Sequence, residues 1–363
     1  MANTSIYQNI ATRTGGDIYI GVVGPVRSGK STFIKRFMEN LVIPNISSEF
    51  ERERANDELP QSASGRTIMT TEPKFIPENG VEISLDSNAE LKVRMIDCVG
   101  YIVPSSIGYI EDEQPRMVMT PWFEEPIPFN MAAELGTQKV ITEHSTVGLV
   151  VTTDGSISDI PRDEYEEAEE RVIEELKSIN KPFVILLNCV YPHSKESKEL
   201  AEKLTIKYEI PVIPLNCIDL DEAQIVKIIS KVLFEFPIKE ISLNMPSWVS
   251  ALSPEHWLRE NLQDTVKKSC YKIKKIRDVE IMNEDISCNE FVDICEIDNI
   301  ELGHGKAEIK VVLNDELFYK VITEKSGLEI ANDEELMDCI SNLADIKKKY
   351  ERFIRNFMLR MLL

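Results

Sequence analysis

The sequence has 363 residues, 43% of them hydrophobic, which is enough for two or three domains with buried cores. Its 62 acidic and 41 basic side chains give a formal charge of −21, which argues against broad binding to nucleic acid. The seven cysteines and four histidines show no metal-ligand spacing, and no apolar run is long enough to span a membrane. We therefore expect a cytosolic globular protein that meets any membrane only peripherally.

The first predicted strand, residues 17–23, leads into a glycine-bearing loop and then a helix. The loop reads Gly24-Pro25-Val26-Arg27-Ser28-Gly29-Lys30-Ser31, with Thr32 next, and matches the phosphate-binding pattern GxxxxGK[ST]. In such a loop main-chain amides and the helix N-terminus surround phosphate oxygens, the lysine adds a positive charge, and the serine hydroxyl binds Mg²⁺. The strand-loop-helix order predicts a nucleoside triphosphate site. The alternative is a glycine turn in which the Lys-Ser pair is incidental, and such a turn would not require a strand before it and a helix after it.

Residues 65–73 lie where switch proteins keep a threonine that reaches Mg²⁺ only when the γ-phosphate is present. Thr70 and Thr71 are both candidates, one for the metal and the other for orienting water, and the sequence does not rank them. The alternative is that both are ordinary strand residues. Arg27 and Arg66 are candidates for stabilising transition-state charge, although solvated arginines are commoner.

The next predicted strand, residues 91–99, carries Asp97, with Gly100 three positions later. In this DxxG arrangement we expect Asp97 to hold Mg²⁺ through a coordinated water and the Gly100 N–H to sense the γ-phosphate. A DxxG pattern alone is weak, and it gains weight from the loop upstream. The predicted metal-binding set is therefore Ser31, Asp97 and Thr70.

Further along, apolar strands at 146–154, 182–188 and 210–216 alternate with predicted helices, including 162–179 and 221–234. This alternation predicts right-handed crossovers in a three-layer α/β domain of the P-loop NTPase, GTPase-like class, which we place at residues 1–237. For residues 238–363 we expect a smaller α+β domain. Its predicted elements are one long helix carrying Leu258 to Ile276, strands at 288–297 and 307–313, and a helix from Asn332. The side of that last helix that carries Phe353 either packs on its own domain or faces a lipid or partner.

The end of the strand at 182–188 bears on the choice of nucleobase. In guanine-specific switch proteins this strand ends in NKxD, whose aspartate accepts hydrogen bonds from guanine. Here the residues are Asn188-Cys189-Val190-Tyr191, so the asparagine is kept while the lysine and the carboxylate are absent. Without that acceptor little penalises adenine, and the sequence favours ATP over GTP.

Longer segments resemble the stage IV sporulation protein A family, and the proline-rich stretch after Gly100 carries more of this resemblance than the short loop does. The matching segments include TGGDIYIGVVGPVRSGKSTFIKRFM, DELPQSASGRTIMTTEPKF, IDCVGY and TPWFEEPIPFNMAAELGTQKVITEHSTVGLVVTTDG. On the matching positions the resemblance implies that Lys30 and Ser31 act in the Walker A loop, that Asp97 is the Walker B carboxylate, and that Thr70 and Thr71 are sensor threonines.

The resemblance also implies an ATPase of the mother-cell cytoplasm that hydrolyses ATP with Mg²⁺ and self-assembles into a homopolymer, the basal layer of the spore coat on the outer forespore membrane. It implies a membrane anchor in the form of a small amphipathic sporulation peptide, and the recruitment of other coat proteins. Family members continue into a further C-terminal region, which we expect to be missing here because the sequence ends within a predicted helix. A GTP-binding regulatory switch and a nucleotide-holding scaffold without turnover remain open as alternatives.

Overall fold

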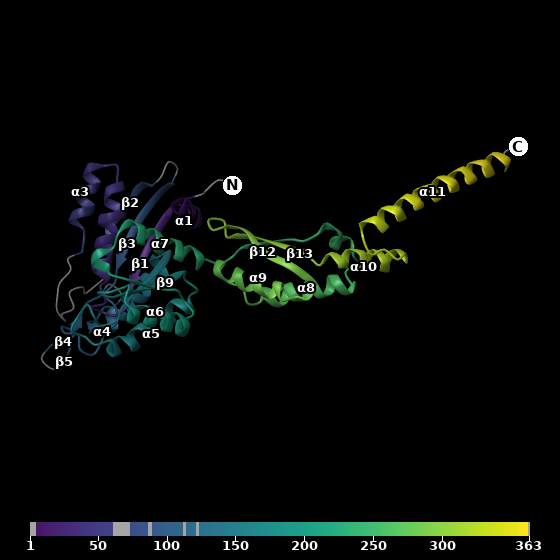
Figure 1. Ribbon diagram of the computed structural model, residues 1–363. Coiled ribbons are helices and arrows are strands. Elements are labelled where there is room, and N and C mark those ends of the chain that lie inside the picture. Colours follow the sequence, from purple (N-terminus) through teal and green to yellow (C-terminus); the bar gives the residue numbers. More distant parts are fainter. Residues whose placement is uncertain (1–4, 61–72, 86–88, 112–113, 121–122, 362–363) are drawn as a thin grey trace. The chain divides into compact units, whose positions relative to one another are not determined.

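The computed structural model of the chain describes residues 5–60, 73–85, 89–111, 114–120 and 123–361 (Figure 1). These residues form two compact units. The first comprises Met1–Glu240, Lys274–Arg277 and Ile300–Ala307, and the second comprises Ile241–Ile273, Asp278–Asn299 and Glu308–Leu363. The first unit is built on a six-stranded sheet and the second on a three-stranded one. The predicted fold class, an α/β P-loop NTPase-like domain followed by a smaller domain, is confirmed.

The six-stranded sheet of the first unit is parallel except at one edge. Five strands run in the same direction, and β2 joins β3 in antiparallel fashion at the end of the sheet. Parallel strands covered on both faces read as continuous apolar runs, which is how the sequence predicted them. The strands in spatial order are β10 (Val212–Leu215), β9 (Phe183–Asn188), β8 (Val147–Thr153), β1 (Asp17–Val23), β3 (Ala89–Asp97) and β2 (Lys74–Leu85).

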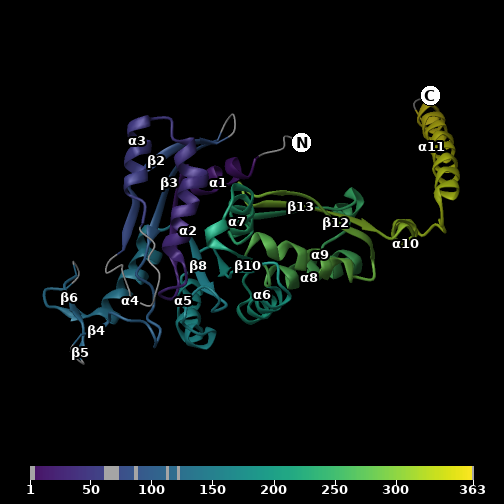
Figure 2. The same cartoon turned by 60° about the vertical axis from the view of Figure 1, so that its left-hand side comes forward.

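Helices cover both faces of this sheet, giving the three predicted layers (Figure 2). Neighbouring residues of one strand face opposite layers, so that Leu149 of β8 belongs to one buried core and Val150 to the other. The helices packed on the Leu149 side are α1 (Ile6–Thr14), α2 (Lys30–Phe37) and α7 (Glu222–Phe234). Those on the Val150 side are α4 (Phe129–Lys139), α5 (Glu166–Ser178) and α6 (Lys195–Tyr208).

In the proline-rich stretch between β3 and α4, the described residues form two small ladders, and Ile110, Met117 and Met119 are more than half exposed. Its strands are β4 (Ile110–Glu111), β5 (Gln114–Pro115), β6 (Met117–Val118) and β7 (Ile127–Pro128), and the helix α3 (Glu49–Asp57) precedes β2. Short helical turns elsewhere in the chain span Met38–Val42, Ile43–Asn45, Val140–His144, Arg162–Tyr165, Cys217–Asp219, Ser247–Ala251 and Ile276–Asp278.

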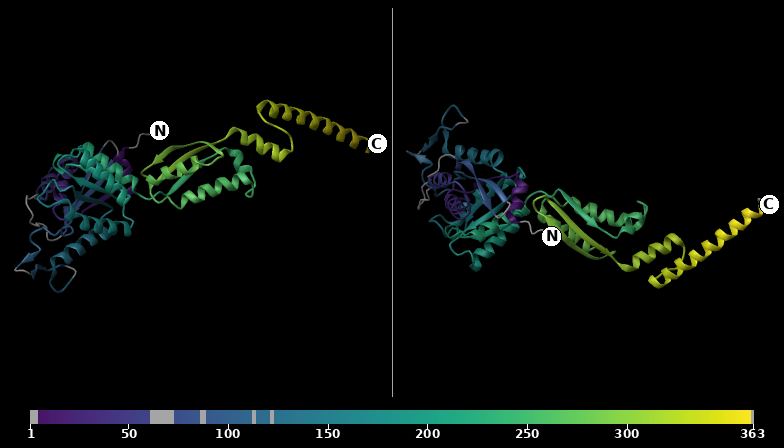
Figure 3. Two further views of the ribbon diagram at one scale, coloured as in Figure 1. Left: turned by 60° about the horizontal axis from the view of Figure 1, so that its bottom comes forward. Right: turned by 90° about the horizontal axis from the view of Figure 1, so that it is seen from above.

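In the second unit, two helices lie along one face of the three-stranded sheet (Figure 3). Alternate residues of β13, including Ile309, Val311 and Leu313, are buried, as are Leu258 and Leu262 of α8. The elements are β11 (Glu240–Asn244), α8 (Trp257–Cys270), α9 (Val279–Ser287), β12 (Val292–Glu301), β13 (Lys306–Leu313), α10 (Asp315–Ser326) and α11 (Asp333–Met361).

Two sequence-based expectations for this region are wrong. The single helix predicted to run through Ile276 ends at Cys270, because Ile276 is fully buried in the first unit and its N–H donates to Phe236 O at 3.0 Å. The strand predicted from Cys288 begins only at Val292, because Cys288 still caps α9 by donating its N–H to Glu284 O. In both places a specific contact overrides the local periodicity.

The long helix α11 shows its apolar side chains to solvent. Met337 is 65% exposed, Leu343 50%, Ile346 60% and Phe353 64%, so this side of the helix is not buried in a core. No helix in the described part of the chain is both long and apolar enough to cross a membrane.

Candidate functional site

The loop between β1 and α2 has a backbone that only its glycines allow. Gly24 has φ 137° and Gly29 φ 99°, and Arg27 between them adopts φ 62°. A Cβ at position 24 would lie 2.2 Å from Val151 O, so no larger residue fits without a shift of β8. This alternation of backbone conformations forms a concave run of amides that leads into the N-terminus of α2, with Thr32 in its first turn.

The segment after β3 holds this loop in place. Val26 N–H donates to Tyr101 O at 2.8 Å, and Tyr101 N–H donates back to Gly24 O at 3.3 Å, so that Pro25 and Tyr101 form a parallel bridge. Tyr101 is 2% exposed and its hydroxyl donates to Glu175 of α5. The sequence analysis did not single out Tyr101, although it directly follows the predicted Gly100.

Lys30 is enclosed by the loop. Its side chain is 5% exposed, and Nζ donates to Pro25 O at 2.6 Å and to Gly24 O at 3.3 Å. Burial lowers the pKa of Lys30 to about 8, with the nearby Asp97 opposing that shift. A buried ammonium held by two neutral carbonyls in a loop at a helix N-terminus is an environment that a polyanion would stabilise.

Ser31 and Asp97 meet at the mouth of the loop. Ser31 Oγ donates to Asp97 Oδ2 at 2.7 Å, and Asp97 is 2% exposed at the end of β3. The second carboxylate oxygen, Oδ1, is buried with no hydrogen-bond partner among the residues that the structure describes, and burial raises the pKa of Asp97.

This pair fits Mg²⁺, which takes hydroxyl and carboxylate oxygens and commonly uses only one or two protein ligands beside phosphate and water. It is a small donor set. Within the described ranges, no three histidine, cysteine, aspartate or glutamate side chains gather as a metal cluster. The third predicted ligand, Thr70, lies outside the described residues, as do Thr71 and Arg66.

Gly100 closes the site from the side of β3. It has φ 91°, and a Cβ there would lie 2.4 Å from Gly24 O and 2.5 Å from Lys30 Nζ. Only a glycine can bring its backbone this near to the lysine, so the structure brings Gly100 and Lys30 together. The expected role of the Gly100 N–H toward a γ-phosphate stays a prediction.

Asn188 links three segments at the end of β9. Its Nδ2 donates to Ser28 O in the loop at 3.0 Å, and its Oδ1 accepts from Cys217 N, just after β10, at 3.1 Å. A Cβ at Gly29 would lie 2.2 Å from Asn188 Nδ2, so the loop and this amide are closely fitted. The structure thus places Asn188, the residue kept from the NKxD pattern, beside the loop.

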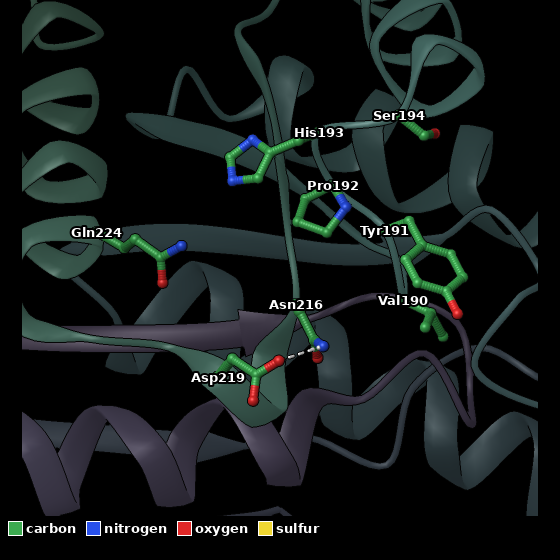
Figure 4. A pocket seen from close by; sticks show the side chains of 8 residues that line it. All are labelled: Val190, Tyr191, Pro192, His193, Ser194, Asn216, Asp219 and Gln224. Atoms are coloured by element: carbon green, nitrogen blue, oxygen red, sulfur yellow. Dashed lines mark hydrogen bonds between the residues drawn. The ribbon is translucent and has the colours of Figure 1, made fainter.

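A pocket of about 540 Å³ lies at the ends of β9 and β10, lined by residues that follow each strand (Figure 4). Residues 190–194 line one side of it, and Asn216, Asp219 and Gln224 line the other. Tyr191 stands at the position where NKxD has its aspartate, so no carboxylate comes from there. Asp219, in the turn after β10, brings a carboxylate to the pocket instead, and no sequence pattern had predicted a role for it. The sequence signal was limited to the Leu-Asn-Cys that ends each of the two predicted strands, at 187–189 and 215–217.

Comparison with known proteins gives consistent matches. The family model described as "Stage IV sporulation protein A, ATPase domain" matches residues 1–237, and the one described as "Stage IV sporulation protein A, middle domain" matches residues 238–359. Stage IV sporulation protein A of Clostridioides difficile (strain 630) is 49% identical over 350 residues, which cover 96% of this chain and 71% of that protein. The protein of the same name from Bacillus subtilis (strain 168) is 48% identical over 352 residues, covering 97% and 72%.

Among solved structures, a crystal structure of a mutation variant of SsGBP aligns with a TM-score of 0.34 and 14% identity, over 61% of this chain and 56% of that chain. A score at this level carries no argument about function.

Proposed function

Because this chain belongs to the stage IV sporulation protein A family and carries its ATPase domain, we propose that it hydrolyses ATP to ADP and phosphate and that hydrolysis drives its self-assembly. The single observation that supports this most is the buried Lys30 ammonium, held by the loop of residues 24–31 beside the Ser31–Asp97 pair. A cation, inward-facing amides and a hydroxyl–carboxylate pair are the groups that phosphoryl transfer uses.

In this proposal the loop amides and Lys30 bind the phosphate chain and stabilise the charge that develops on it, while Ser31 and Asp97 hold Mg²⁺. When bound, Mg²⁺ supplies further positive charge against the phosphate oxygens. The Gly100 N–H is proposed to respond to the terminal phosphate, and the close approach of the Gly100 backbone to Lys30 supports this. Thr70 and Thr71 are proposed as sensor residues, with Arg27 as a candidate for transition-state charge.

We further propose that the assembled form is a homopolymer, the basal layer of the spore coat, located in the mother-cell cytoplasm at the outer forespore membrane. The proposed partners are a small amphipathic peptide that anchors the polymer to the membrane surface and other coat proteins. Family membership supports these proposals, and the residues of the nucleotide site do not bear on them.

The direct test is phosphate release by the purified chain with ATP and Mg²⁺. We expect turnover that stops when the metal is removed with a chelator and returns when Mg²⁺ is added. Tight, selective GTP binding in competition with ATP would favour the regulatory switch instead. Nucleotide binding without phosphate release above background would favour the scaffold.

The pH dependence of nucleotide binding tests the environment of Lys30. Since burial lowers the pKa of Lys30 to about 8, the free protein carries this charge below that pH and loses it above. Binding a triphosphate at higher pH therefore requires uptake of a proton, and affinity should fall as pH rises through about 8. Fluorescent-nucleotide titrations between about pH 7 and 9.5 would measure this. The variant Lys30→Arg, charged throughout, should bind without that fall, and a flat profile for the unmodified protein would contradict the assignment.

A further inference from the structure

The pocket of about 540 Å³ holds polar groups that the phosphate chemistry does not use. Ligands of parallel α/β sheets lie over the carboxyl ends of the strands, and this pocket opens at the ends of β9 and β10. The side chain of Asn188, the last residue of β9, spans from the loop carbonyl of Ser28 to the amide of Cys217, which follows β10. For a nucleotide whose phosphates occupy the loop, the pocket at these strand ends is the candidate site for the base, and its volume suits a small ligand.

One wall of the pocket offers surface on which a base can stack. Val190 is 39% exposed, Tyr191 74%, and Pro192 follows them, so the wall offers apolar and aromatic surface (Figure 4). Every base has a flat face that can stack on such groups. His193 and Ser194 complete this wall with polar groups, and the opposite wall carries the only carboxylate among the eight lining residues.

That opposite wall presents an oriented carboxylate. Asn216 Nδ2 donates to Asp219 Oδ2 at 2.7 Å, while Asn216 Oδ1 accepts the N–H of Ile218 at 3.0 Å. Both ends of the Asn216 amide are thus engaged, and they fix the Asp219 carboxylate in the turn after β10. A carboxylate only accepts hydrogen bonds, so it requires a donor on the ligand.

Gln224 supplies the complementary group. Its Oε1 accepts the N–H of Asp221 at 3.1 Å in the cap of α7, which leaves its NH₂ as the group it can offer to the pocket. The wall thus combines an acceptor with a donor. The edge of adenine carries an amino donor next to a ring-nitrogen acceptor, whereas guanine carries an oxygen acceptor where adenine has the amino group.

We propose that Asp219 accepts a hydrogen bond from the 6-amino group of adenine, that Gln224 donates to the adjacent ring nitrogen, and that these two residues give the site its selectivity for ATP. The inference rests on the proposed function of the same site and names its specificity-determining residues. Guanine in the same orientation would direct its O6 at the carboxylate, whereas guanine turned so that its N1–H and 2-amino group face Asp219 would satisfy that carboxylate. The relative affinities of ATP and GTP therefore decide between the two bases.

The test compares the affinities of ATP, GTP and purine riboside triphosphate, which lacks the 6-amino group, for the unmodified chain and for Asp219→Ala. The unmodified chain should bind ATP about tenfold or more tightly than the purine riboside analogue, the effect of one hydrogen bond to a charged group. Asp219→Ala should bind these two equally, because only ATP loses affinity. Asp219→Asn, whose amide can donate to O6, should shift the balance toward GTP.

The matched control is Asp293→Ala, which removes an exposed carboxylate of β12 in the other unit and should leave the ATP preference unchanged. If the unmodified chain bound ATP and the analogue equally, or if Asp219→Ala lost both equally, the inference would be overturned while the proposed function stood. Tighter binding of GTP than of ATP by the unmodified chain would overturn the adenine assignment. Failure to bind any triphosphate would overturn both proposals.

Discussion

Replacing Lys30 with alanine should lower the rate of ATP hydrolysis by about a hundredfold or more, the usual effect of removing a group that stabilises transition-state charge. The reason is its enclosure: Nζ lies among loop carbonyls, and the side chain is 5% exposed, so that water cannot replace the missing charge. Phosphate release at saturating ATP is the measurement.

The matched control is Lys35→Ala, in the same helix α2. Lys35 lies at the surface, where its side chain is 40% exposed and 3.9 Å from Glu39, and its loss should leave turnover nearly unchanged. The ligand-free Lys30→Ala protein should also be at least as stable as the unmodified protein near pH 7, since burial of the ammonium disfavours its charged form. A normal rate of hydrolysis by Lys30→Ala would show that the assigned site is wrong.

Replacing Arg162 with alanine should lower the free energy of unfolding of the first unit by about 3–5 kcal/mol, because it leaves a buried carboxylate without its cation. Arg162 donates to both oxygens of Glu169, at 2.6 and 2.8 Å, and the Glu169 side chain is fully buried. Tyr208 donates to the same carboxylate at 2.8 Å, and Thr152 of β8 also donates to it. This network joins α5 and α6 to the central strand next to the nucleotide loop.

The chain contains its own control for this second prediction. Arg171 makes the same two-pronged contact with Glu134, at 2.7 and 2.8 Å, but these side chains are 53% and 31% exposed. Arg171→Ala should therefore cost only about 0–1 kcal/mol. Urea unfolding of the two variants would compare them, and equal losses would contradict the role given to burial.

The features predicted well from the sequence are those set by local chemistry. The glycines of the loop are needed at 24 and 29 because the backbone there has positive φ, and the strands β1, β8 and β9 read as apolar runs because both of their faces are covered. The positions of Lys30, Ser31 and Asp97 near one another follow from the adjacency of β1 and β3 at their carboxyl ends.

The features that were missed depend on contacts between distant segments. Ile276 leaves the predicted helix because it packs against another part of the chain, and no window around it reveals that partner. Asp219 reaches the pocket only because β10 pairs with β9 in a particular register, which a strand pattern by itself does not specify. The apolar spacing of α11 predicts a helix, but it does not tell whether the apolar side is covered, and the structure shows that side exposed.

The way the loop is held also has a consequence for the order of events during synthesis. Residues 24–31 leave the ribosome early, yet the groups that shape them belong to Tyr101, Val151 and Asn188. Translation of the roughly 160 residues between the loop and Asn188 takes about 10 to 30 s at 5–20 residues per second. During that interval the loop of the nascent chain lacks the contacts that give it its nucleotide-binding conformation. We therefore expect ATP to stabilise the first unit only once β9 has joined the sheet.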